Sequence, residues 1–181
     1  MKRHIRILIM LAGLSSLLSA EGFTLESKDV KGQLSINEVF NGFGCTGKNI
    51  SPELNWKNAP EGTKSFALTV YDPDAPTGSG WWHWIVFNIP KESLSLQAGA
   101  GDASKNILPK GSIQNVTDYG LSGFGGACPP KGDKAHQYIF TIHALDVDKL
   151  ELDGKQSAAI AGYNINAHTI QKASLIAYYA H

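Results

Sequence analysis

The segment 72–88 gathers side chains able to do chemistry: two acids, two prolines, a histidine and three tryptophans. Asp72 and Asp74 lie within twelve residues of His83 and follow an apolar run directly. Prolines stiffen a loop, and tryptophans supply an apolar wall with a polar edge. Rigid, aromatic-lined polar clusters of this kind are more typical of ligand pockets than of plain core. The segment therefore predicts one side of a binding site.

A second pair of polar side chains, His136 and Tyr138, stands at the start of a later apolar run. Because side chains alternate along a strand, these two share a face and Gln137 points away from it. Imidazole N–H and phenol O–H groups are hydrogen-bond donors, and a neighbouring carboxylate keeps a histidine protonated. Together with Asp72 and His83, the pair predicts a small anion site in which phosphate or carboxylate accepts charge-assisted hydrogen bonds from the histidines.

Other interpretations of Asp72, His83 and His136 stay open. Structural ion-pair networks collect the same residue types, so the three side chains would then satisfy only one another. Two histidines and a carboxylate also resemble a catalytic zinc set, but no His-Glu-x-x-His or Cys-x-x-Cys spacing supports one, and no metal site is predicted. A phosphoester hydrolase would use a histidine as general acid–base, yet the chain has no Gly-x-Ser-x-Gly nucleophile motif. We therefore predict no catalytic residue and assign Asp74 to supporting the turn.

Three apolar runs must position these side chains. The segments 66–71, 84–89 and 138–145 are apolar on both parities, which predicts central strands covered on both faces. In the second run, alternation assigns His83, Ile85, Phe87 and Ile89 to one face and Trp82, Trp84 and Val86 to the other. Shorter runs at 54–56 and 175–179 predict two further strands.

Clusters of glycine, proline and asparagine separate these runs, which is the layout of a β-rich domain. Helix is predicted only near the end of the chain. The segment 155–162 is rich in alanine, with Gly162 as its stop, and Asn164 would cap a second short helix to about residue 172. Between the strands, 94–113 predicts a long loop, a kind of segment that is often functional or mobile.

Residues 1–20 have the pattern of a secretory signal peptide. A basic start precedes the apolar run 7–18, and the small residues Ser19 and Ala20 follow. The run is shorter than the roughly 20 residues that a transmembrane helix needs, so we predict no stable membrane insertion. We expect a single domain at 21–181, exported to the periplasm.

The charge of the mature chain excludes some partners. Losing Lys2, Arg3 and Arg6 with the signal peptide leaves 13 Lys and no Arg against 16 Asp+Glu. A weakly acidic chain without arginine does not suit nucleic acid, which attracts basic patches. Without a guanidinium, the predicted anion site also has no bidentate clamp.

The only two cysteines, Cys45 and Cys128, are predicted to form a disulfide, because an exported chain meets an oxidising compartment. Two buried thiols that never meet are the alternative. The sequence cannot decide between them, because the Cα separation determines whether a bridge can form.

Three motifs in order carry a resemblance to a known family: Asp-Pro-Asp-Ala-Pro at 72–76, His83 in the tryptophan-rich strand, and Pro-Pro-Lys-Gly at 129–132 before His136 and Tyr138. Their combination resembles the phosphatidylethanolamine-binding protein family, and more closely its bacterial Raf-kinase-inhibitor-like (YbhB/YbcL) branch. The similarity covers nearly all of the mature chain.

The resemblance implies a mainly β fold, an antiparallel β-sandwich with a few short helices near the C-terminus. It implies a pocket for phosphate, acetate or a phosphoryl headgroup without any cofactor, built here from Asp72, Pro76, Trp81, His83, Pro130, His136 and Tyr138. Eukaryotic members of the family inhibit kinases or proteases by protein contact, and no enzyme activity is typical of it. Gln137 stands where the family usually has arginine, which puts an outward salt bridge in doubt.

The sequence thus predicts an exported, non-enzymatic binding protein with a small anion pocket, acting as a modulator or inhibitor through contact with a protein target. A hydrolase, or an interaction protein whose pocket is vestigial, is the alternative. The sequence leaves the oligomeric state open, a homodimer included.

Overall fold

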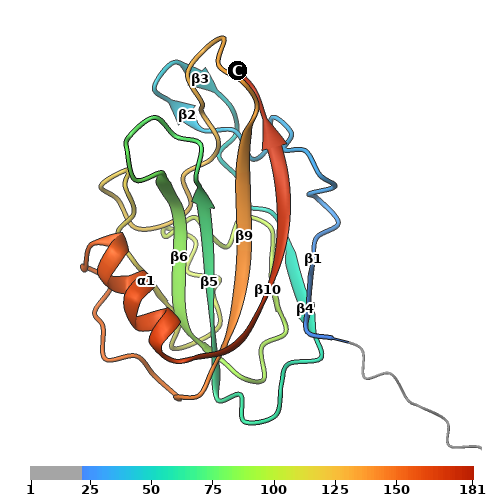
Figure 1. The fold of residues 1–181 in the computed structure, drawn as a ribbon, viewed down its shortest axis with the longest axis vertical. Helices are drawn as coiled ribbons and strands as arrows, with labels where there is room; N and C mark the ends of the chain where they lie inside the picture. The colour runs from blue at the N-terminus through green and yellow to red at the C-terminus, as the bar shows by residue number, and fades with distance from the viewer. Residues whose placement is uncertain (1–21) are drawn as a thin grey trace, which may run out of the picture.

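The computed structural model of the protein describes residues 22–181, so the predicted signal peptide lies outside the described residues. Its largest sheet has five strands, and all neighbouring strands are antiparallel (Figure 1). Their order in the sheet is β10 (Thr169–Tyr179), β9 (His136–Leu145), β5 (Ser65–Asp72), β6 (Trp81–Pro90) and β8 (Ile113–Gln114). The three predicted central strands are the three middle strands of this sheet.

Two smaller sheets and one helix complete the described fold. The second sheet pairs β1 (Thr24–Glu26), β4 (Leu54–Lys57) and β7 (Ser95–Leu96), and a small hairpin pairs β2 (Asn41–Gly42) with β3 (Cys45–Thr46). The helix α1 spans Ala158–Ala167 and lies beside β6 (Figure 1). The predicted mainly β, antiparallel sandwich is confirmed. Across 22–181, no helix is long and apolar enough to cross a membrane.

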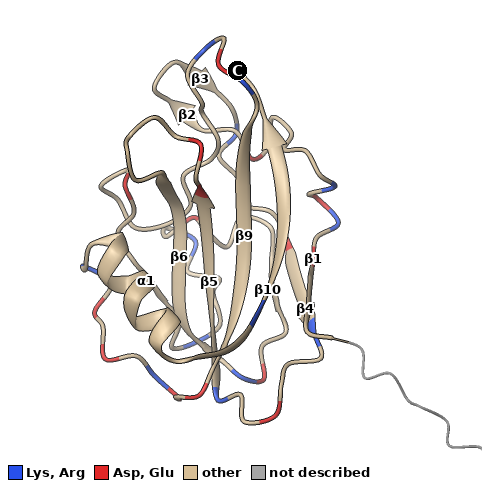
Figure 2. Cartoon of the chain, in the orientation of Figure 1, with Lys and Arg blue, Asp and Glu red and all other residues tan. Residues whose placement is uncertain are grey.

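The large sheet is covered on both faces, as its apolar strands predict. One core cluster packs Leu68, Trp84 and Phe140 against Trp56 of the second sheet, and the other packs Ile85 and residues of β5 and β9 against α1. Figure 2 shows that Lys, Asp and Glu gather on the loops and near the strand ends, while the middles of β5, β6 and β9 carry no charge. The polar ends of these strands are therefore where chemistry can lie.

The end of the chain differs from the prediction. A single ten-residue helix replaces the two predicted short ones, and 169–179 is an eleven-residue strand paired along β9. Gly162 does not stop the helix: it lies inside α1, where a Cβ would be 3.4 Å from the ring of Trp82. Pairing with β9 outweighs the local helical pattern, because β-branched residues such as Thr169 and Ile170 fit a strand.

The alternation predicted for the second strand is wrong at two points, because β6 carries two bulges. Val70 pairs with Trp84 but Tyr71 pairs with Trp82, so His83 is an extra residue. A second shift, between Phe66 and Leu68 of β5, moves Ile89 to the face of Trp84 and Val86. A bulge re-aims the side chain at the extra position. The imidazole of His83 consequently contacts Tyr138, with ring centroids 5.0 Å apart.

The predicted disulfide is present. Cys45 of β3 and Cys128 are bridged with a Cα–Cα distance of 5.9 Å across 83 residues of sequence. That separation lies within the range that a disulfide can span. The bridge fastens the β2–β3 hairpin to the segment that leads to β9.

Candidate ligand pocket

A cavity of about 180 Å³ lies where β5 ends and where β6 and β9 begin. The structure brings together there all seven residues predicted to bind a ligand: Asp72, Pro76, Trp81, His83, Pro130, His136 and Tyr138. The two segments that supply them are about sixty residues apart in sequence, and the antiparallel pairing of β5 with both β6 and β9 makes them adjacent.

The carboxylate of Asp72 organises the turn that follows β5. Its Oδ1 accepts hydrogen bonds from the backbone N–H groups of Asp74, at 2.8 Å, and Ala75, at 3.1 Å. This short-range bonding is the usual role of aspartate in an Asx-turn. The other oxygen, Oδ2, lies 2.8 Å from Nδ1 of His136. Asp72 is only 3% exposed, so its position is fixed by these bonds.

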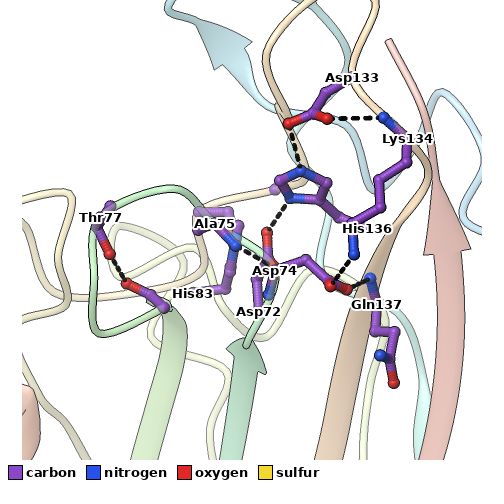
Figure 3. A network of polar contacts seen from close by, with 12 residues as sticks. Asp72, Asp74, Ala75, Thr77, His83, Asp133, Lys134, His136 and Gln137 are labelled. Atoms are coloured by element: carbon purple, nitrogen blue, oxygen red, sulfur yellow. Dashed lines mark hydrogen bonds and ion pairs between the residues drawn. The ribbon is translucent and has the colours of Figure 1, made fainter.

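His136 lies between two carboxylates. Figure 3 shows Asp72, His136 and Asp133 in a row, with Nε2 of the imidazole 3.3 Å from Asp133. Burial acts against a charged ring, but the hydrogen bonds to Asp72 and Asp133 outweigh it and raise the pKa of His136 above its ordinary value. Both ring nitrogens are therefore engaged, and Asp133, whose side chain is 40% exposed, occupies the nitrogen that a ligand would need.

Asp74 ties the turn to β9. Its carboxylate accepts hydrogen bonds from Lys134 Nζ at 2.7 Å and from the backbone N–H of Gln137 at 2.9 Å. These two bonds, that to Lys134 first, lower the pKa of Asp74. The side chain of Gln137 points away from the cavity (Figure 3), as strand parity predicts.

His83 and Tyr138 present polar atoms that the protein leaves unpaired. Nδ1 of His83 lies 2.7 Å from the carbonyl oxygen of Gly125, so it carries the proton, and Nε2 is a bare acceptor. Among residues 22–181, neither Nε2 of His83 nor Oη of Tyr138 has a hydrogen-bond partner, although both atoms are buried. Burial lowers the pKa of His83 and raises that of Tyr138, so each ring is neutral.

The two histidines differ in their surroundings, which modifies the prediction that both donate hydrogen bonds to the anion. The pKa of His136 is raised, but both of its ring nitrogens face carboxylates, whereas the pKa of His83 is lowered and its Nε2 has no partner within the described chain. The sequence shows which residues meet, but not how deeply each is buried or which hydrogen bonds it makes, and the balance of the two determines the sign of the pKa shift.

Tyr119 is a wall residue that the sequence reasoning missed. It lines the cavity, donates from Oη to the carbonyl oxygen of Gly126 at 2.7 Å, and packs edge-on against Trp81. A Cβ at Gly125 would clash with this ring, which explains part of the glycine-rich stretch 123–126. Tyr119 lies in a loop without periodicity, so no pattern could find it.

A family model described as phosphatidylethanolamine-binding protein matches residues 26–180. The chain is 49% identical to the UPF0098 protein YbcL of Escherichia coli K12 over 172 residues, 94% of each chain. It is 48% identical to the UPF0098 protein YbhB of the same strain over 148 residues, covering 82% of this chain and 92% of YbhB.

The fold is also similar to solved structures of relatives. The crystal structure of E. coli YbcL, described as a new member of the mammalian PEBP family, matches with a TM-score of 0.86 and 51% identity, covering 88% of this chain and 98% of YbcL. A phosphatidylethanolamine-binding protein homologue from Chlamydia trachomatis matches with a TM-score of 0.72 and 28% identity, covering 88% and 97% of the two chains.

Proposed function

The chain belongs to the phosphatidylethanolamine-binding protein family, and from that premise we propose that it is a binding protein whose cavity takes a small phosphate-like anion. One observation carries the proposal: Nε2 of His83 and Oη of Tyr138 are buried, without partners within the described chain, and belong to residues that line the cavity. Buried polar groups are nearly always hydrogen-bonded in native proteins. Two unpaired polar atoms in one cavity indicate that a ligand or ordered solvent forms hydrogen bonds with them.

Tyr138 and His83 contribute differently to an anion. Tyr138 donates its O–H directly, because its raised pKa keeps the phenol protonated. His83 must first take up a proton at Nε2, since its lowered pKa leaves the ring neutral until an anion binds. Anion and proton then bind together, because a negative ligand stabilises the imidazolium. Binding should therefore strengthen as the pH falls.

Calorimetric titration of the wild-type protein with sulfate tests this function. Sulfate is the better probe for pH because phosphate changes its own charge near neutrality. We expect one site per chain, with affinity rising by up to about tenfold for each unit of pH between 8 and 6, because linkage couples one proton to one anion. Inorganic phosphate should compete with sulfate. An absence of binding, or an affinity that is equal at both pH values, would contradict the proposal.

Replacing Asp133 with asparagine is expected to strengthen sulfate binding roughly three- to tenfold, because rim charges tune the attraction of ions to a site. The substitution frees Nε2 of His136 from a carboxylate and removes a negative charge beside the cavity. Asp72 still holds the ring from the other side.

Asp146→Asn is the matched control for this variant, because it removes the carboxylate of another Asp–His pair, with His168 at 3.0 Å, on the exposed surface. Its sulfate affinity should equal that of the wild type. Unchanged or weaker binding by Asp133→Asn would mean that Asp133 does not compete with the anion.

We also propose that the protein acts after export, through contact with another protein. The disulfide suits an oxidising compartment, which supports the periplasm as the location. Phe43 and Leu121 are 73% and 72% exposed, and Phe43 also lines the cavity. Exposed apolar side chains beside a ligand site are suited to a protein interface whose affinity depends on pocket occupancy.

A further inference from the structure

The side chain of His181 lies beside the disulfide that joins Cys45 and Cys128. Nδ1 of His181, the last residue of the sequence, is 3.6 Å from Sγ of Cys45, and the ligand atoms of Cys45, Cys128 and His181 all lie within 4.8 Å of one another. This trio shares no residue with the set of Asp72, His83 and His136, and its sulfur atoms are softer ligands. Two sulfurs and one imidazole are typical ligands of zinc and copper(I).

The spacing suits a tetrahedral metal ion. With Zn–S bonds of about 2.3 Å and Zn–N bonds of about 2.0–2.1 Å, tetrahedral angles put sulfur and nitrogen about 3.5 Å apart. The observed separation of Cys45 Sγ and His181 Nδ1, 3.6 Å, already has this value. Once the bridge is reduced, the two sulfurs must move from bonding distance to about 3.8 Å.

The backbone holds all three residues in place. The carbonyl oxygen of His181 accepts a hydrogen bond from the N–H of Gly132 at 3.1 Å, which fixes the end of the chain after β10. Cys45 lies in the β2–β3 hairpin opposite Gly42. Cys128 follows Ala127, which forms a bridge with Val39. Ligands on fixed elements lose little freedom on binding a metal.

We propose that Cys45, Cys128 and His181 bind a d¹⁰ metal cation, Zn²⁺ or Cu⁺, when their disulfide is reduced. A dithiol reductant supplies two electrons and two protons, so the S–S bond becomes two thiols while the dithiol becomes a disulfide. Zn²⁺ then displaces both thiol protons to solvent and accepts the lone pair of neutral His181. Water or another small ligand takes the fourth position. The disulfide and the bound metal are thus two alternative ways of joining the β2–β3 hairpin to Cys128.

The two states have a consequence for the neighbouring cavity. Cys128 and Phe43 line it, and Phe43 lies in the hairpin that the bridge fastens. A bound metal would keep that hairpin attached under reducing conditions, whereas the reduced, metal-free protein would lose the link. Metal binding would thus hold the rim of the pocket in place after the disulfide is reduced.

The test uses the purified chain, reduced with a dithiol, separated from it without oxygen, and titrated with Co²⁺ and then Zn²⁺. We expect one Co²⁺ per chain with thiolate-to-cobalt charge-transfer absorption and the visible bands of tetrahedral cobalt, both abolished by Zn²⁺. The oxidised protein should show neither band. His181→Ala should weaken Zn²⁺ binding by at least about tenfold, the lower limit seen even for outer-shell partners of metal ligands.

His168→Ala is the matched control, since it removes a histidine that is paired with Asp146 away from the disulfide. Its Zn²⁺ affinity should equal that of the wild type. Three results would overturn the proposal: no charge-transfer band after reduction, equal metal binding by oxidised and reduced protein, or equal affinity in His181→Ala. Circular dichroism of each reduced sample verifies that the fold persists, and a Zn²⁺-induced rise in Tm that His181→Ala lacks provides a second measurement.

Discussion

Replacing His83 with alanine is expected to weaken sulfate binding by roughly ten- to hundredfold and to remove its dependence on pH. Hydrogen bonds to charged groups contribute about 1.5–3 kcal/mol, and each 1.4 kcal/mol is a factor of about ten in affinity. The buried Nε2 of His83 is the atom that we expect to gain the proton and donate to the anion. With the imidazole gone, no group whose charge changes near neutrality remains free to bind the ligand.

Two conservative variants separate the nitrogens of His83. Asparagine places its amide near the position of Nδ1 and retains a donor for the carbonyl oxygen of Gly125, but it lacks a group at Nε2. Glutamine places its amide near Nε2. We expect His83→Asn to lose binding as the alanine variant does, and His83→Gln to retain part of it without dependence on pH.

His168→Ala serves as the control for the loss of an exposed imidazole. If all three His83 variants bound sulfate with the affinity of the wild type, the orphan nitrogen would not belong to an anion site. A folded His83→Ala that kept the pH dependence would assign the proton to another group.

The strands of the large sheet could be predicted because their apolar runs are continuous, but the same continuity hid the bulges. Ile85 and Val86 face different clusters and both are fully buried, so an inserted residue leaves no trace in the hydrophobic pattern. The direction of the His83 side chain depends on the bulge at that residue. The bulge can be recognised only from the strand pairing, in which Val70 pairs with Trp84 and Tyr71 with Trp82.

In the candidate site too, some residues could be predicted from the sequence and others could not. Asp72 and His136 could be predicted as site residues because their side chains are a carboxylate and an imidazole and because each lies in a recognisable motif. Asp133 was missed because an aspartate in a Lys-Gly-Asp-Lys stretch is typical of a solvent-exposed turn. Its role becomes visible only from the 3.3 Å contact with His136. The charge of each histidine follows from burial and partners, which are properties of the folded chain.

His143 is expected to make the free energy of unfolding depend strongly on pH. It lies on the face of β9 opposite Tyr138 and is 5% exposed. Nε2 is 3.3 Å from Oγ1 of Thr69, and Nδ1 is 3.2 Å from Oγ1 of Thr169. Burial, with a smaller contribution from the charge of Lys172, lowers the pKa of His143 from 6.5 to about 4. The folded protein therefore holds this ring neutral over a wide range of acid pH.

The sign follows from proton binding in the two states. Between pH 6.5 and about 4, the unfolded chain binds a proton at His143 and the folded chain does not. The free energy of unfolding should therefore fall as the pH drops through this window, by about 3 kcal/mol from this residue alone, and no further below it. Above pH 6.5 the contribution is complete.

Urea unfolding of the wild type and of His143→Gln at several pH values between 7 and 4 measures this term. Glutamine offers an amide to the two threonine hydroxyls but does not titrate, so its stability should fall less steeply, by up to about 1.4 kcal/mol per pH unit. His83, whose pKa is also lowered, is present in both proteins, so its contribution cancels in the difference. Lys172→Gln should change the slope little, because burial is the larger cause. Parallel curves for the wild type and His143→Gln would mean that His143 takes up its proton in the folded state as readily as in the unfolded chain.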